Sequence, residues 1–290
     1  MFTQKRTIMQ KEPFYPHQAI PLTLTAVVCG FGIAVLFLEV YLLNGFGAAE
    51  KIVLQLHWQD ILVGMTIYLK TAIDFAIFIG RLMASYPGWK NRVMIEIGTA
   101  LGNIAGTLAI LLLWNIFREI RFLMAGMIIL AGLVLIRMAE EGLEHVKDEE
   151  GKYKMSFGGI ELWLEKLLRH FNRLVAPILN KIIPKTDMKA TSNKTYWGLF
   201  ILSFSVPFIL GLDDFAGYIP LFNIVNVVGF ATGVFLGHMV LNIALFLSPK
   251  TTIHAVKNPI ISFLGSLAFI GIALWGFYEA ALLVGFGPHA

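Results

Sequence analysis

The sequence contains a single cysteine and few charged residues for its length. Cys29 is the only cysteine in 290 residues, so an intramolecular disulfide and a Cys-x-x-Cys metal or redox site are both excluded. Charged residues make up 14% of the chain, whereas an average soluble domain has roughly 25%. The chain also lacks the His-Glu-x-x-His zinc motif, the phosphate-binding Gly-Lys-Ser/Thr loop and the Gly-x-Ser-x-Gly elbow. We therefore expect neither an enzyme nor a bound cofactor.

Apolar residues, in contrast, are abundant and occur in long runs. They make up 57% of the chain, and the mean hydropathy is +0.72. A helix needs about 20 apolar residues to cross the hydrocarbon core of a bilayer. The runs are continuous and do not alternate residue by residue, which excludes a transmembrane β-barrel. We predict an all-α integral membrane protein with seven transmembrane helices, over residues 20–44, 60–83, 93–114, 120–138, 196–220, 223–248 and 259–285.

The Lys and Arg residues gather on one predicted side of the membrane. If the N-terminus is cytoplasmic, the cytoplasmic segments hold 18 of the 23 Lys and Arg residues, and the other side holds Lys51, Arg118 and Arg121. The positive-inside rule then places the N-terminus in the cytoplasm and the C-terminus across the inner (plasma) membrane. The first apolar run is too long for a signal-peptide core, so we expect it to remain as an anchored helix.

The largest predicted segment outside the membrane is a cytoplasmic loop. From Ile160 to Ile183, apolar residues recur at helical spacing opposite Lys166, Arg169 and Arg173, a pattern typical of an amphipathic helix on an anionic surface. We interpret it as a structural interfacial helix or linker, with a regulatory or partner-binding element as the alternative. The predicted units are an N-terminal segment with an additional helix (1–45), a first three-helix set (58–140), the loop (141–195) and a second three-helix set (196–286).

The two predicted three-helix sets carry short matching segments in the same order. AIDFA at 72–76 matches LDDFA at 212–216, LGN at 101–103 matches LGH at 236–238, and MAE at 138–140 matches FYE at 277–279. The three matches have nearly equal separations along the chain. Because each set has an odd number of helices, the two sets enter the membrane from opposite sides, as the inverted repeats of secondary transporters do.

Three aspartates, Asp74, Asp213 and Asp214, lie deep in predicted spans. A carboxylate at the bilayer centre costs about 2.5–3.5 kcal/mol, so it is retained where it is paired, hydrated or bound to an ion. Asp213 and Asp214 are surrounded by residues that loosen a helix and free its carbonyl oxygens. These residues are Pro207, Gly211, Gly217 and Pro220. We predict that the three acids bind the transported ion. The alternative is that Asp74 only pairs with Lys70 or Arg81.

Asn103 and His238 occupy matching positions in the two sets. They would supply one oxygen and one imidazole nitrogen to the same cation, and the alternative is an interhelical hydrogen bond. Oxygen ligands with one imidazole suit a hard or borderline divalent ion. The predicted metal ligands are Asp74, Asp213, Asp214 and His238. The residues predicted to support them, or to couple protons, are Glu96, Arg81, Lys70 and Asn242.

The segment GLDDFAGYIPLF at 211–222 resembles the cadmium-resistance transporter family of the lysine-exporter superfamily, and AIDF at 72–75 adds to the resemblance. Members of this family look like six-helix inverted repeats with an acidic motif on the first helix of each half. The resemblance implies secondary transport, typically efflux, of a small cation, with Asp74 and Asp213 or Asp214 at the motif positions. The chain differs in its additional N-terminal helix, its long loop and its Asp-Asp pair where the family tends to carry Asp-Asn.

These features predict a proton-coupled exporter of a divalent metal ion, with the lipid bilayer and a small cation as partners and no nucleic acid. Two alternatives stay open. One is export of an amino acid or another small organic cation, and the other is a membrane accessory protein that holds a partner and transports nothing. A membrane enzyme is disfavoured, because no nucleophile and base are assembled. A homo-oligomer is compatible with the sequence, which does not define the number of subunits.

Overall fold

The computed structural model describes residues 19–45, 51–86, 88–144, 146–147, 150–154, 159–182, 195–216, 219–256 and 258–285. Within these ranges the chain is helical, with one isolated β-bridge between Lys147 and Tyr153. The helices are α1 (Ala19–Gly45), α2 (Trp58–Thr71), α3 (Ile73–Ser85), α4 (Trp89–Phe117), α5 (Arg121–Glu144), α6 (Ile160–Ile182), α7 (Tyr196–Ala216), the 3-10 helix η1 (Ile219–Asn223), α8 (Val227–Leu247), α9 (Pro249–Val256) and α10 (Pro259–Leu283). The predicted all-α fold class is confirmed.

Five helices in the described part of the chain are long and apolar enough to cross a membrane: α1, α4, α5, α8 and α10. Helices α2 and α3 add a sixth span if they count as one, with a bend of 65° between them. Helix α7 contributes a shorter described apolar stretch, Tyr196–Phe208. Several candidate membrane-spanning helices are thus present, as expected for an α-helical membrane protein, and the count of seven stays a prediction.

The span predicted over residues 60–83 is two helices, which is a correction to the sequence analysis. The helices meet at Ala72, whose ψ of 23° departs from helical geometry. The Thr71 hydroxyl donates to the Tyr68 carbonyl at 3.0 Å, and such bonds from Thr to the preceding turn bend helices. The sequence has neither proline nor glycine at this point, so it carries no strong signal of the break.

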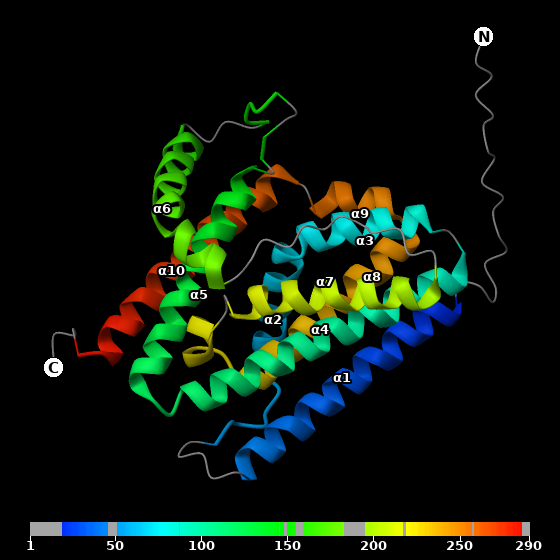
Figure 1. Ribbon diagram of the computed structural model, residues 1–290, viewed down its shortest axis with the longest axis horizontal. Helices are drawn as coiled ribbons and strands as arrows, with labels where there is room; N and C mark the ends of the chain where they lie inside the picture. Colours follow the sequence, from blue (N-terminus) through cyan, green and yellow to red (C-terminus); the bar gives the residue numbers. More distant parts are fainter. Residues whose placement is uncertain are drawn as a thin grey trace.

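Helices α4 and α7 lie side by side and run in the same direction (Figure 1). Gly98 lies against the Phe200 carbonyl, and Gly102, one turn later, lies against the Phe204 carbonyl. A methyl group at either glycine would overlap the backbone of α7. The two glycines therefore permit the close approach of the helices, as small residues do between membrane helices.

Helices α2 and α8 form a second interface of the same kind. Gly233 of α8 lies against the Ile61 carbonyl of α2, and Gly237 lies against the Met65 carbonyl. Residue numbers rise together on the two helices, so α2 and α8 are also parallel to each other. Here too a side chain on Gly233 would overlap the neighbouring backbone.

Helix α1 packs along α4 and α8. Its Gly32 faces Ile104 of α4 and Phe235 of α8, and its Thr25 contacts Glu96 nearer the start of α4. Helix α1 therefore runs parallel to α4, and Figure 1 shows α8 running in the opposite direction.

Helices α5 and α10 pair with each other in antiparallel fashion. Gly132 of α5 lies against Phe277 of α10, whereas Gly142 lies against Ser266. Helix α6 lies along the last turns of α5, and its bounds match the predicted amphipathic helix to within one residue. The short helix α9 packs on α3.

Candidate functional site

A chain of hydrogen-bonded polar side chains crosses the interface of α2, α4 and α8. Tyr68 Oη lies 2.6 Å from His238 Nδ1. Asn242 Nδ2 lies 3.0 Å from His238 Nε2 and 3.0 Å from Thr99 Oγ1. None of these four side chains is more than 4% exposed. Buried polar groups of this kind are retained where each finds a partner, so the chain holds the three helices in one register.

Both ring nitrogens of His238 have a hydrogen-bond partner. Nε2 lies against the Asn242 amide and Nδ1 lies against the Tyr68 hydroxyl, and the tautomer of the ring decides which nitrogen donates. A metal ion could bind His238 only after one of these two bonds is broken, and the predicted metal role of His238 stays a prediction.

Glu96 extends the polar chain toward the start of α4. The Thr99 hydroxyl donates to the Glu96 carbonyl at 2.9 Å, and the Thr25 hydroxyl of α1 donates to Glu96 Oε2 at 2.7 Å. The side chain is 2% exposed, and Oε1 is buried without a hydrogen-bond partner. A buried carboxyl oxygen without a partner is energetically costly. Glu96 is therefore a stronger functional candidate than the sequence alone indicates.

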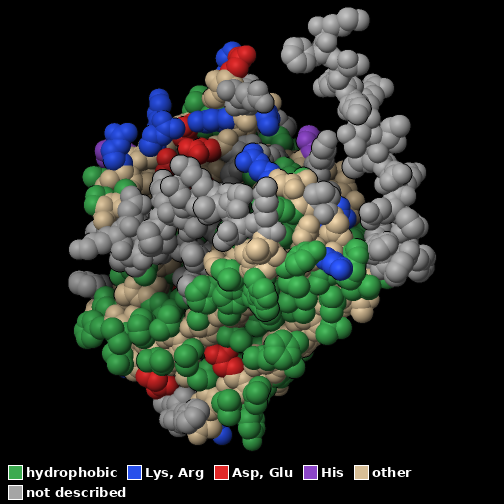
Figure 2. Space-filling model, turned by 45° about the vertical axis from the view of Figure 1, so that its right-hand side comes forward, with side chains coloured by type: hydrophobic (Ala, Val, Ile, Leu, Met, Phe, Trp, Pro, Cys, Tyr) green, Lys and Arg blue, Asp and Glu red, His purple; other side chains and the backbone are tan. Residues whose placement is uncertain are grey.

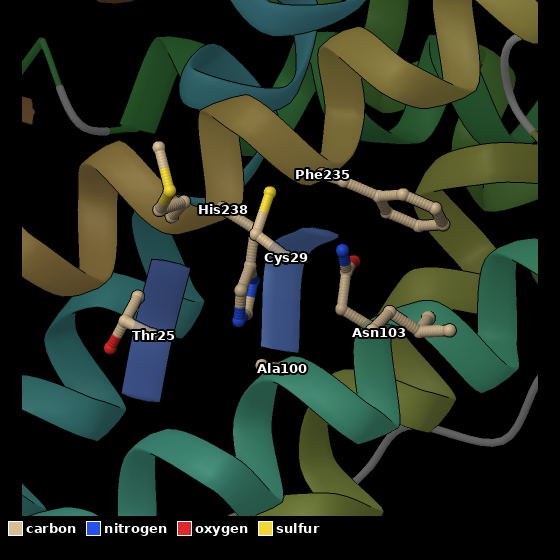
Figure 3. Close-up of a pocket in the computed structure, with 8 residues that line it drawn as sticks. Thr25, Cys29, Ala100, Asn103, Phe235 and His238 are labelled. Atoms are coloured by element: carbon tan, nitrogen blue, oxygen red, sulfur yellow. The ribbon is translucent and has the colours of Figure 1, made fainter. Parts of the chain in front are cut away.

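A small pocket of about 10 Å³, with room for about one water molecule, lies beside this chain, between α1, α4 and α8 (Figure 3). Asn103 and His238, which the sequence analysis paired, both line it. Asn103 Nδ2 is buried, has no hydrogen-bond partner among the described residues and is able to donate to a guest. The full lining is Thr25, Cys29, Ala100, Asn103, Ile104, Phe235, His238 and Met239. The additional helix α1 therefore forms one wall of the pocket.

The three predicted acids have side chains outside the described part of the structure, but their backbones lie in helices. Asp74 is the second residue of α3, immediately after the break at Ala72. Asp213 and Asp214 lie in the last turn of α7, which ends at Ala216. Each acidic segment thus lies in the first or the last turn of a helix.

The two cations proposed as alternative partners of Asp74 differ in their surroundings. Lys70 Nζ is buried and has no hydrogen-bond partner among the described side chains, which do not include Asp74, and its stem crosses Gly265 of α10, where any side chain would collide with it. Arg81 is exposed on α3. Lys70 is thus a second buried polar group near the break without a partner among the described side chains.

No group of three or more His, Cys, Asp or Glu side chains in the described ranges is placed to hold a metal ion. The predicted set of Asp74, Asp213, Asp214 and His238 includes three side chains outside those ranges, so it stays a prediction. Sequence reasoning missed Tyr68, Thr25 and Thr99. Their only signal was a polar group inside an apolar run.

Comparison with known proteins found no matching family model, no similar curated protein and no similar solved structure. The resemblance to the cadmium-resistance family therefore stays a prediction, and function has to be argued from the arrangement of the side chains and helices.

Proposed function

We propose that the protein is a secondary transporter that exports a small cation, with a divalent metal ion exchanged for protons as the first candidate. In this proposal α2 to α5 and α7 to α10 are two inverted sets of three spans. The observation that carries it is the packing of the helices. If each helix is replaced by its counterpart in the other set, the interface between α4 and α7 becomes the interface between α8 and α2. The pair of α5 and α10 is its own counterpart.

The contacts at these two interfaces agree in their register. Gly98 and Gly233 are separated by the same number of residues as Asn103 and His238. The same separation lies between Gly102 and Gly237. On the partner helices, one common separation likewise relates Ile61 to Phe200 and Met65 to Phe204. Matching contacts at matching separations support a duplicated unit. The antiparallel course of α4 and α8 supports an inverted arrangement.

Inverted repeats allow alternating access, because rocking one set against the other opens a central site first to one side and then to the other. Binding sites in such proteins lie where interrupted helices of the two halves meet. In the proposal, the ends of α2 and α7 next to Asp74 and Asp213 are interruptions of this kind. The acids then bind the cation or protons in turn, and Glu96 and Lys70 are two titratable groups of the described residues available to couple the two.

The test is transport by the purified protein in liposomes. Proton release would be recorded against gradients of Mn²⁺, Cd²⁺, Zn²⁺, Mg²⁺, Ca²⁺ and lysine for the wild type, Asp74→Asn, Asp214→Asn and the matched control Glu144→Gln. Glu144 is exposed at the end of α5. Proton flux driven by a metal ion and lost only in the two aspartate variants would support antiport.

Other outcomes separate the alternatives. Flux with lysine alone would favour an exporter of amino acids or organic cations, in which the same acids bind an ammonium group. Full transport in both aspartate variants would refute the acidic site. Absence of flux with every solute would favour the accessory protein, which moves nothing.

A further inference from the structure

The outward half of α6 has a composition unlike its inward half. The inward half packs on α5 and buries Leu164 and Leu168 together with both acids of the helix, Glu161 and Glu165. The exposed residues between Ile160 and Pro177 are all apolar, basic or histidine. They are Ile160, Leu162, Trp163, Lys166, Leu167, Arg169, His170, Arg173, Leu174 and Pro177. The outward half of α6 therefore carries no acid.

The acid at the centre of the buried face, Glu165, is neutralised where it lies. Lys147 Nζ and Tyr153 Oη donate to the two oxygens of Glu165, each at 2.6 Å, and Arg169 also bonds to it. Two turns further on, Asn172 donates to Glu140 of α5 at 2.6 Å. These bonds hold the orientation of α6 about its own axis, so the exposed half stays exposed.

The exposed half divides into two stripes. At 100° per residue, Ile160, Trp163, Leu167 and Leu174 fall within about 60° of the helix circumference, and Lys166, Arg169 and Arg173 fall within another arc of about 60°. Trp163 and Leu174 are 63% and 66% exposed. An apolar stripe beside a basic stripe is typical of a helix at a membrane surface.

Helix α6 lies beside one end of a candidate membrane-spanning helix. It runs back along α5, from Glu165 beside Lys147 to Asn172 beside Ile136, and α5 is a candidate spanning helix. Figure 2 shows Lys and Arg side chains gathered at one end of the molecule, above a belt of hydrophobic side chains. If this belt marks the hydrocarbon core, the last turns of α5 lie at the depth of the lipid headgroups.

We propose that the outward face of α6 binds the anionic headgroups of the adjoining leaflet, with Lys166 and Arg173 on the phosphates and Trp163, Leu167 and Leu174 among the upper acyl chains. Leu162, also exposed, lies between the basic residues. Anionic lipid is the occupant that matches this face. A helix beside the bilayer with exposed basic and apolar stripes, and no exposed acid, complements an anionic surface in both charge and polarity. The site does not depend on the transport proposal.

The test compares hydrogen exchange of α6 amides in the full-length protein in nanodiscs of phosphatidylcholine, with and without phosphatidylglycerol. Phosphatidylglycerol should slow exchange in α6. Each basic residue near an anionic surface contributes about fivefold to binding, so Lys166→Gln/Arg173→Gln should raise the exchange rate up to about thirtyfold. The matched control Lys152→Gln/Lys154→Gln removes the same charge outside α6 and should leave exchange unchanged. Exchange in α5 reports that each variant is folded.

High salt should reproduce the effect of the double substitution on the wild type, because it screens headgroup contacts. Slow exchange that phosphatidylglycerol does not alter would mean that the apolar stripe alone holds α6, and would overturn the headgroup site. Fast exchange in both kinds of nanodisc would assign the face to a protein partner, and would overturn it too.

Discussion

Asn103 of α4 and His238 of α8 line the same pocket from different helices, although they lie far apart in the sequence. The two side chains differ in what they have available. Both nitrogens of His238 are already in hydrogen bonds, whereas Asn103 Nδ2 is buried and has no partner among the described residues. Asn103 is therefore the residue of this pair that is available to bind a guest. His238 is instead held in place by its hydrogen bonds to Tyr68 and Asn242.

Substituting Tyr68 by Phe should destabilise the protein by about 1–3 kcal/mol, because the buried Nδ1 of His238 loses its hydrogen-bond partner while the ring packing is kept. The measurement is the free energy of unfolding in mixed micelles. Tyr278→Phe is the matched control, since Tyr278 is 52% exposed, and it should change stability by less than about 0.5 kcal/mol. Equal effects of the two substitutions would refute the bonding assigned to His238.

Thr25→Val should weaken the attachment of α1 to α4. The substitution keeps the shape of the side chain but removes the donor to Glu96 Oε2, and the expected cost is about 1–3 kcal/mol. Combining it with Glu96→Gln in a double-mutant cycle should give a coupling energy of about 0.5–3 kcal/mol. Thr23→Val, at an exposed position of the same helix, should show no coupling to Glu96. A coupling energy near zero for Thr25 would contradict the contact.

Gly102→Ala and Gly233→Ala should be destabilising by similar amounts, about 1–3 kcal/mol each, because a methyl group meets the backbone of α7 in one case and of α2 in the other. Gly126→Ala has open space around it and should be neutral or stabilising. Unfolding of the three variants in mixed micelles tests this. If only one of the first two variants is affected, the two interfaces are not equivalent.

The single cysteine makes the pocket directly observable. Cys29 lines it and is 7% exposed, so any thiol labelling of the wild type reports on this one position. We expect slow labelling by a small methanethiosulfonate reagent and a further loss of labelling in Ala100→Leu, which fills the pocket from α4. Mass spectrometry measures the extent, and Cys29→Ser gives the background. Labelling that Ala100→Leu leaves unchanged would show that the reagent arrives by another route.

The attachment of α6 should weaken in acid. Burial raises the pKa of the Glu165 carboxyl, but the bonds from Lys147 and Tyr153 and the charges of Lys147 and Arg169 outweigh it, so the pKa is lowered. A lowered folded-state pKa stabilises the fold above the ordinary value near 4.5, and this stabilisation is lost as the pH falls through the lowered value. The protection of α6 amides from hydrogen exchange, relative to the intrinsic rate at each pH, should fall over that interval. Glu165→Gln should exchange faster at neutral pH and lose the acid dependence; an unchanged profile would contradict this account.

The sequence by itself determined the class of the protein and the course of its regular helices. Long apolar runs have to form helices, because no water in the bilayer core satisfies their backbone groups. The first span, predicted over residues 20–44, is Ala19–Gly45, and the amphipathic helix predicted to end at Ile183 is Ile160–Ile182. Periodicity within one helix was sufficient for both.

Only the tertiary structure decided which polar groups meet. Tyr68 and His238 are 170 residues apart, and Thr25 and Glu96 are 71 apart. A periodic pattern tells which face a residue occupies but not which helix that face will touch. The break at Ala72 was also beyond the sequence, because the bend follows from local bonding and packing without proline or glycine. Partners and breaks depend on contacts between segments far apart in the chain, and those contacts exist only in the folded protein.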